Sequence, residues 1–257
     1  MRRSPLSEAV PNQGNAIAPS AWRSLLARAN ELPEALLDRL GCPLVMAAPP
    51  AWAESRHRVL MLGQETAHWT IPGARTLREC LALSDPVRAL AEAYAAFDFG
   101  VAAPRVHFIR ALRRLERELE AGVRGAVMWS NAAHIDCAPA GRASASIAAL
   151  PRAERDAVLD WQRGILRAEV SELRPNALVA MCGPKYDDVL DAEFPGLERE
   201  PAGETPSREL VRLVHPDLPR TAFRTHHPRT LEINKLGHLG TIIDLVTQEV
   251  GDSVSSA

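Results

Sequence analysis

The sequence predicts an α/β fold: a single three-layer α/β/α domain with a short, mainly parallel central sheet of four to five strands. Short, almost continuously apolar segments alternate with longer amphipathic ones, as in parallel sheets that helices cover on both faces. A chain of 257 residues is long enough for one such domain. Polar motifs follow several of the apolar segments directly, where ligands bind in open α/β sheets.

Five segments have the character of buried strands. Each is a short run rich in Leu, Val, Met, Ala or Phe, and polar or turn-forming residues border it. The last one is expected to run into a loop at its two histidines. The segments are 57–63 (HRVLMLG), 125–131 (GAVMWSN), 177–183 (ALVAMCG), 209–215 (ELVRLVH) and 221–228 (TAFRTHHP).

The segments between these strands predict helices, and several carry end signals. Asp85 is an expected N-cap, Gly122 an expected C-terminal stop, and the long helix of residues 150–175 is expected to end before its proline. The helical segments are 20–40 (two short helices broken near Pro33), 85–97, 103–122, 150–175, 184–194 and 234–250.

The ends of the chain differ in composition from its middle. Residues 1–20 are rich in Pro, Ser, Asn and Gly and are expected to form a flexible tail, residues 21–250 the domain, and residues 251–257 a disordered tail. The N-terminus lacks the apolar segment of a secretion signal, and no apolar run reaches transmembrane length. We therefore expect a cytoplasmic protein that does not bind membranes.

The cysteines and the charges restrict the possible partners. Four widely spaced cysteines include no C-x-x-C pair, so a zinc cluster has no local support. The net charge is −2, so any nucleic-acid site has to be a local basic patch. The helix of residues 103–122 offers one, with five arginines, although its glutamates favour a solvated, self-paired face. The arginines are Arg105, Arg110, Arg113, Arg114 and Arg117, and the glutamates are Glu116, Glu118 and Glu120.

Two strand ends carry candidate chemistry in the first half of the chain. After Gly63, Glu65 is a candidate general base or a stabiliser of a cationic sugar, and the alternative is a carboxylate that caps the next helix. Asn131 ends the second strand, and its amide can donate and accept at once, as the edge of a pyrimidine requires. The alternative for Asn131 is an Asx-turn. His134 and Asp136 form a weaker candidate pair.

The last predicted strand ends in an unusual pair of histidines before a proline. His227 can donate a hydrogen bond to an oxyanion, Arg229 can hold a phosphate, and Leu231 can act as an exposed apolar wedge. The alternative is a histidine packed against a turn, which is the interpretation that we prefer for His226.

Taken in order, these motifs resemble the uracil-DNA glycosylase superfamily over roughly residues 57–250. Its first motif, G-Q-D-P-Y, corresponds to residues 63–67 (GQETA). A middle strand ends in the Asn that reads the base, here Asn131, and a third strand ends in a glycine before a helix, here LVAMCGPKY. The last motif begins H-P-S with a Leu four residues after the His, which here corresponds to His227 and Leu231.

The resemblance implies a DNA glycosylase that acts as a monomer without metal or cofactor. A pyrimidine nucleotide is flipped out of DNA, and hydrolysis of its N-glycosidic bond leaves an abasic site. Glu65 and His227 are the implied catalytic residues. Four residues are expected to contact the base, with Trp69 or Trp129 stacking on it, and two to contact DNA. The base-binding residues are Gln64, Ala67, Trp69 and Asn131, and the DNA-binding residues are Arg229 and Leu231.

The first motif departs from the family pattern at three positions. Glu65 replaces Asp and is one methylene longer, Thr66 replaces Pro, and Ala67 replaces the Tyr that excludes C5 substituents. The sequence therefore predicts activity on pyrimidines substituted at C5, such as hydroxymethylated or glucosylated bases of phage DNA, in antiviral defence. The alternatives are a repair enzyme for uracil or other deaminated bases and an inactive glycosylase fold that only binds nucleic acid or protein. An unrelated α/β hydrolase is disfavoured, because no G-x-S-x-G motif is present.

Overall fold

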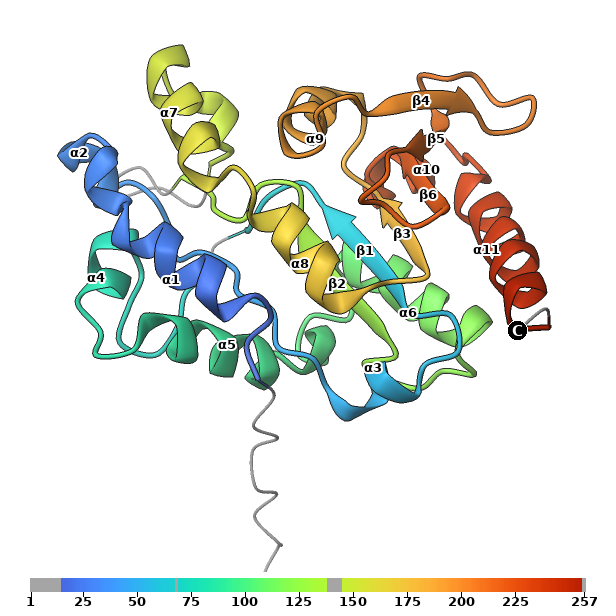
Figure 1. The fold of residues 1–257 in the computed structure, drawn as a ribbon, viewed down its shortest axis with the longest axis horizontal. Helices are drawn as coiled ribbons and strands as arrows, with labels where there is room; N and C mark the ends of the chain where they lie inside the picture. The colour runs from blue at the N-terminus through green and yellow to red at the C-terminus, as the bar shows by residue number, and fades with distance from the viewer. Residues whose placement is uncertain (1–14, 68, 138–144, 256–257) are drawn as a thin grey trace, which may run out of the picture.

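The computed structural model describes residues 15–67, 69–137 and 145–255 and has one six-stranded sheet as its centre (Figure 1). The strand order is β2-β1-β3-β6-β5-β4, and the first four of these strands are parallel. β5 and β4 are added antiparallel at one edge. The strands are β1 (Val59–Gly63), β2 (Val127–Asn131), β3 (Ala177–Ala180), β4 (Glu198–Pro201), β5 (Leu210–Val214) and β6 (Thr221–Thr225). The predicted mixed α/β fold with a mostly parallel sheet is confirmed.

The helices connect these strands and close the domain at the C-terminal end. Their bounds are α1 (Pro19–Ala27), α2 (Glu34–Leu37), α3 (Pro50–Glu54), α4 (Leu77–Leu81), α5 (Pro86–Ala96), α6 (His107–Leu119), α7 (Arg152–Gln162), α8 (Ile165–Leu173), α9 (Asp187–Glu193), α10 (Pro228–Ile233) and α11 (His238–Ser255). Asp85 caps α5 as predicted, because its carboxylate accepts a hydrogen bond from the Arg88 amide at 3.2 Å.

Several predicted boundaries are wrong for identifiable reasons. The helix of residues 150–175 is two helices, because Arg163 leaves the helical conformation and Gly164 adopts a φ of 91°. The sheet has six strands instead of four to five, because β4 is a largely exposed, charged edge strand without an apolar run. The loop expected after His227 is the short helix α10. A capping box of Thr76 and Glu79 starts α4, which was not predicted.

Both predicted tails are too long. The Ile17 amide donates to the Met46 carbonyl at 2.9 Å, and α1 already begins at Pro19, so the folded chain includes part of the predicted N-terminal tail. At the other end α11 extends to Ser255, inside the segment that we expected to be disordered. Residues 1–14 and 256–257 lie outside the described residues.

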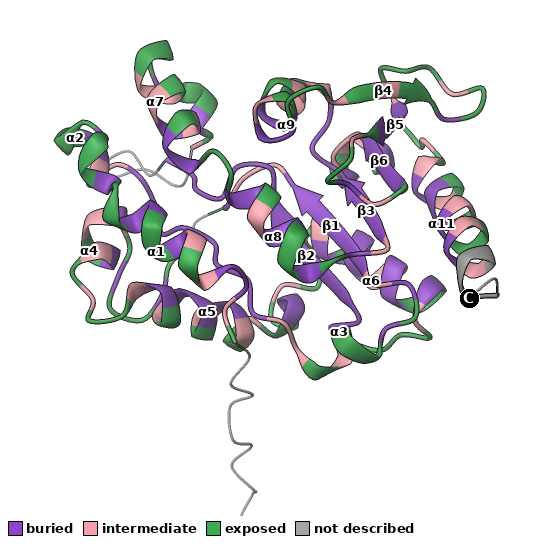
Figure 2. Cartoon of the chain, viewed as in Figure 1, coloured by how far each residue is buried: buried purple, intermediate pink, exposed green. Residues whose placement is uncertain are grey.

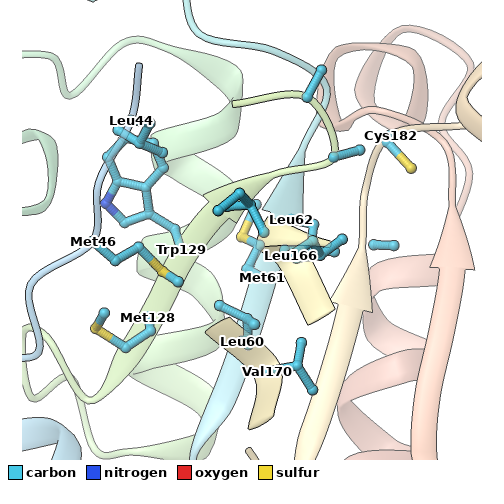
Figure 3. Packing of buried hydrophobic residues seen from close by; sticks show 14 of the residues in the cluster. Leu44, Met46, Leu60, Met61, Leu62, Met128, Trp129, Leu166, Val170 and Cys182 are labelled. Atoms are coloured by element: carbon cyan, nitrogen blue, oxygen red, sulfur yellow. The ribbon is translucent and has the colours of Figure 1, made fainter. Parts of the chain in front are cut away.

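The hydrophobic core lies on both faces of the parallel strands (Figure 2). Every residue of β1, β2, β3 and β6 is buried. Figure 3 shows Leu60 and Leu62 of β1 among Trp129 of β2 and Leu166 and Val170 of α8. Because β1 has β2 on one side and β3 on the other, the chain changes direction across the sheet at β1. The carboxyl end of such a strand is where open α/β sheets bind their ligands.

Candidate functional site

A cleft of about 510 Å³ opens at the carboxyl ends of β1, β2 and β6. Glu65, Asn131 and His227 all line it, so the structure brings together three polar residues that follow three different strands. The other lining residues are Gly63, Gln64, Thr66, Ala67, Trp69, Phe97, Ala103, Val106, Phe108, Ile109, Trp129, Ser146 and Tyr186. The volume falls within the range of clefts that hold small organic ligands.

The carboxylate of Glu65 is held on both oxygens by three donors. The Ser146 hydroxyl donates at 2.5 Å, the Ile147 amide at 2.8 Å, and the Tyr186 hydroxyl donates as well. Burial and the negative charge of Glu65 raise the pKa of Tyr186, so its hydroxyl keeps its proton and remains a donor. These bonds fix Glu65 as an anion facing the cleft, which suits the stabilisation of positive charge better than free movement as a base.

The Asn131 side chain lines the cleft directly beside Gly63, the last residue of β1. It is buried, and its amide makes no hydrogen bond with the residues that the structure describes. A Cβ atom at position 63 would lie 2.4 Å from the Asn131 Oδ1 atom, so only glycine leaves room for this amide. Although the residue as a whole is buried, its amide atoms are not sealed off from the cleft, so a ligand there can form the hydrogen bonds that the described residues do not supply.

Gln64 lines the cleft but has a structural partner. Its side-chain Nε2 atom donates to the Cys182 backbone carbonyl at 2.8 Å. The backbone carbonyl of Gln64 accepts from the Ala133 amide at 2.9 Å. Gln64 therefore joins the ends of β1, β2 and β3. A direct contact of its amide nitrogen with a base, as the sequence predicted, would compete with this bond.

Aromatic rings form the apolar wall of the cleft. Trp69 is edge-on to Phe97 at 5.5 Å and to Trp129 at 6.1 Å between ring centroids. Trp129 is buried and stacks on Tyr94 at 5.1 Å, so one face of its indole is already covered. Phe108, at the start of α6, is half-buried and lies next to Gly63, since its Cε2 atom would be 3.0 Å from a Cβ there. No motif in the sequence marks Phe108 as a cleft residue.

Ala67 is exposed at the rim of the cleft, and its methyl group adds little bulk there. Trp69 occupies part of the wall two residues later, and His68 lies outside the described residues. The buried Thr66 Oγ1 atom and the Nε1 atoms of Trp69 and Trp129 have no hydrogen-bond partner in the described parts of the chain. The cleft is thus lined by apolar surface with a few polar groups, which is typical of small-ligand sites.

His227 is the N-cap of α10, and its Nδ1 atom accepts a hydrogen bond from the Arg229 amide at 3.3 Å. This bond leaves the proton of the neutral ring on Nε2. Burial, followed by the charges of His107 and Arg229, lowers the pKa of His227. A neutral imidazole on the cleft wall therefore offers one N–H donor.

Of the two DNA contacts expected in this last motif, the one assigned to Leu231 is wrong. Leu231 is buried, with Pro228 on the same inner side of α10, so it is not an exposed wedge. The large apolar side chain that α10 exposes is Ile233. Arg229 is exposed and makes no ion pair with a described residue, so it remains available to a phosphate.

The predicted pairing of His134 with Asp136 is wrong. The His134 Nε2 atom lies 2.8 Å from a carboxylate oxygen of Glu169 on α8 and 3.2 Å from the Ser130 hydroxyl. The three side chains are sealed from solvent, and Trp22 also donates to Glu169 at 3.2 Å. Ser130, His134 and Glu169 include the residue types of a nucleophilic triad, but the hydroxyl and the carboxylate share one ring nitrogen, and none of the three lines the cleft.

No described helix is long and apolar enough to cross a membrane. No group of three or more His, Cys, Asp or Glu side chains in residues 15–67, 69–137 and 145–255 is arranged to hold a metal ion. No protein-family model matches the chain, and no curated protein is significantly similar to it.

Proposed function

We propose that this protein is a DNA glycosylase that flips a pyrimidine nucleotide into the cleft and hydrolyses its N-glycosidic bond. We also propose that its fold is a single three-layer α/β/α domain. The observation that carries the proposal is the convergence of Glu65, Asn131 and His227 in one cleft. They are an anion, an amide and a neutral imidazole donor. These are the groups needed for a cationic sugar, a pyrimidine edge and a departing base.

The proposed reaction assigns one task to each group. The bond between C1′ and the base nitrogen breaks, and its electron pair leaves with the base. The Nε2–H group of His227 donates to the base oxygen on which negative charge develops. Glu65, held by Ser146 and Tyr186, stabilises the positive charge at C1′. Water then adds its oxygen to C1′, and the proton that it loses passes to Glu65 or to solvent.

Asn131 and the aromatic wall select the base in this proposal. The Asn131 amide can accept from the ring N–H of a uracil-type base or from the exocyclic amino group of a cytosine-type base, and at the same time donate to the neighbouring carbonyl oxygen or ring nitrogen. Phe108 offers an aromatic face beside Gly63, whereas Trp129 is already covered by Tyr94. We therefore assign stacking on the base to Phe108, with Trp69 and Trp129 as the supporting wall.

The proposed substrate is a pyrimidine with a substituent at C5, for example a hydroxymethylated or glucosylated base, and the proposed role is defence against phage DNA. A cleft of about 510 Å³ has the size that suits a drug-sized ligand, which is larger than a bare pyrimidine ring. Ala67 at its exposed rim leaves space in the position where a tyrosine would narrow the opening.

The test is the formation of abasic sites on matched duplexes that carry uracil, a thymine mismatch, 5-hydroxymethylcytosine or its glucosylated form. We expect cleavage of the C5-substituted bases, abolished in a Glu65→Gln and His227→Gln double variant. Ala67→Tyr is the matched variant for specificity. It should lower the rate on the glucosylated base by at least about tenfold and leave the unsubstituted base within a few-fold. Activity on uracil alone would reject the defence role in favour of repair. Binding of DNA without abasic sites would reject the enzyme.

A further inference from the structure

The exposed side of α6 carries more positive than negative charge. The helix contains four arginines, and Glu118 is exposed with them, but Glu116 is buried and Glu120 binds groups outside α6. Glu116 is buried, where it binds Arg113 at 2.6 Å and the Gly125 amide at 2.7 Å. Glu120, which follows α6, binds the backbone and side chains of residues 55–57. The self-paired face that the sequence favoured is thus only partly formed.

Two hollows lie along this side of α6. One, of about 510 Å³, lies between α6 and the segment formed by α10 and the start of α11. The other, of about 400 Å³, lies between α6 and the loop that precedes it. Arg110 and Arg117 line both hollows. Among the described residues that line them, Glu232 is the sole carboxylate, and the cations are Arg110, Arg113, Arg114, Arg117, Arg124 and Lys235.

The cations are partly paired but not neutralised. Glu232 pairs with Arg110, Glu118 with both Arg114 and Arg117, Asp98 with Arg124, and the buried Glu116 with Arg113. Lys235 makes no ion pair with the rest of the described chain. Exposed pairs of this kind are weak, so an incoming phosphate can replace their carboxylates. The whole protein carries a net charge of −2, which makes this concentration of positive charge local and not a property of the composition.

The position of α6 connects these hollows to the cleft. Its first turn supplies Phe108 and Ile109 to the cleft wall, and Arg110 begins the basic side immediately afterwards. From Arg110 to Arg117 the helix rises about 10 Å. The phosphates of one strand are about 3.4 Å apart along a duplex axis, so this distance corresponds to roughly three phosphates.

We propose that the α6 surface, defined by the six cations above, binds the phosphodiester backbone of the nucleic-acid strand next to the nucleotide in the cleft. The inference rests on the proposed function for its connection to the cleft, but it concerns affinity and not bond cleavage. Arginine forks and a lysine bind phosphate oxygens directly, and the counterions released from DNA make such binding depend on salt.

The test measures the affinity of labelled single-stranded and duplex oligonucleotides without modified bases over a series of KCl concentrations. The variant Arg114→Gln/Arg117→Gln/Lys235→Gln removes three charges from the α6 surface and touches no residue of the cleft. The matched control Arg88→Gln/Arg152→Gln/Arg163→Gln removes three exposed charges from α5, α7 and the residue after α7. Figure 1 shows α7 far from α6.

We expect the α6 variant to bind at least about tenfold more weakly at low salt. Its slope of log affinity against log salt should fall by about 2 to 3 on duplex, since each phosphate contact contributes about 0.9. The control should retain the slope of the wild type. Equal losses in both variants would overturn the inference, because only net charge would then matter. Stronger binding to phosphatidylserine vesicles than to either oligonucleotide would also overturn it.

The outcome is independent of the outcome for the proposed function. If the wild-type protein shows the salt slope and the α6 variant loses it while no duplex gains an abasic site, the inference stands and the glycosylase proposal fails. If abasic sites form and the α6 variant matches the wild type in KM and in salt slope, the glycosylase proposal stands and the inference fails.

Discussion

Two polar clusters lie back to back at the end of β2, and they have opposite characters. Asn131 faces the cleft, whereas the preceding residue, Ser130, faces α8, because successive side chains of a strand point to opposite faces. The cleft combines Asn131 with Glu65 and His227. The buried cluster combines Ser130 with His134 and Glu169. Each therefore contains one histidine and one carboxylate, and composition alone does not distinguish them.

The partners of each histidine make the difference. Burial disfavours the charged form of His134, but the adjacent carboxylate of Glu169 outweighs it and raises the pKa of His134. Burial, followed by the positive charges of His107 and Arg229, lowers the pKa of His227. The pKa of the buried histidine is raised and its Nε2 atom has two partners, whereas the pKa of the cleft histidine is lowered and its Nε2 atom has no partner among the described residues. The comparison shows what distinguishes the candidate functional site from the buried cluster. The residue types are similar, but within the described parts of the chain only the site has a hydrogen-bond donor without a protein partner that borders an open cleft.

The largest effect should follow from breaking the buried cluster. Glu169→Ala removes the acceptor of Trp22, Ser130 and His134 and leaves an uncompensated buried histidine. We expect the free energy of unfolding in urea to fall by about 3–5 kcal/mol. Glu65→Ala is the matched control. It removes an equally well bonded but half-buried carboxylate, and the loss should stay below about 2 kcal/mol. Equal losses would show that the two clusters do not differ as we argue.

The next effect concerns the free donor of the cleft. His227→Ala should lower the rate of abasic-site formation by about 10²–10³-fold, because a donor to the developing oxyanion is lost. His226→Ala changes the neighbouring histidine, which does not line the cleft, and should leave the rate within a few-fold. Single-turnover kinetics on the best substrate of the panel measure both. A comparable loss in the two variants would indicate a structural role for the turn.

The aromatic wall should give a smaller effect. Phe108→Leu keeps an apolar side chain beside Gly63 but removes the aromatic face, and we expect substrate binding to weaken by about 1–3 kcal/mol. Phe97→Leu is the matched control, because Phe97 lines the same cleft but packs edge-on against Trp69. Affinity for an uncleaved substrate, measured in a Glu65→Gln background, compares the two. A larger loss in Phe97→Leu would transfer the stacking role away from Phe108.

The buried strands and the residues at their ends were predictable from the sequence. Buried strands are short apolar runs, and they alternate with amphipathic helical segments. Glu65, Asn131 and His227 each follow an apolar run, and parallel strands bring such ends together. β4 was not predictable in this way, because an exposed edge strand needs no apolar run. The helix break at Gly164 could not be predicted, because a single glycine inside an amphipathic helical pattern is often tolerated.

The parts of the site that were not predictable come from chain segments with no strand-end signal. Ser146 and Tyr186 reach Glu65 from 81 and 121 residues away, and no local pattern marks such contacts. Tyr186 does lie just beyond the third strand, in GPKY, which was the available signal. Leu231 was misplaced because its spacing from His227 does not reveal the helix α10. In that helix, positions 228 and 231 share the inner side.

The smallest effect is a difference in the pH dependence of stability between the two histidines. Because the folded pKa of His134 is raised, its contribution to stability is fully present below the unfolded pKa of about 6.5 and is lost as the pH rises through the folded pKa. The groups that face it are Glu169, Ser130, Trp22 and, at longer range, Glu193, whose own pKa burial raises. The pKa of His227 is lowered, so its effect on stability has the opposite sign: this histidine reduces the free energy of unfolding as the pH falls below about 6.5.

We expect the difference in unfolding free energy between the wild type and His134→Gln to shrink from about pH 6 to about pH 8. The difference between the wild type and His227→Gln should change in the opposite direction. Parallel slopes in the two variants would mean that both histidines have the same environment, against the contrast drawn between the cleft and the buried cluster.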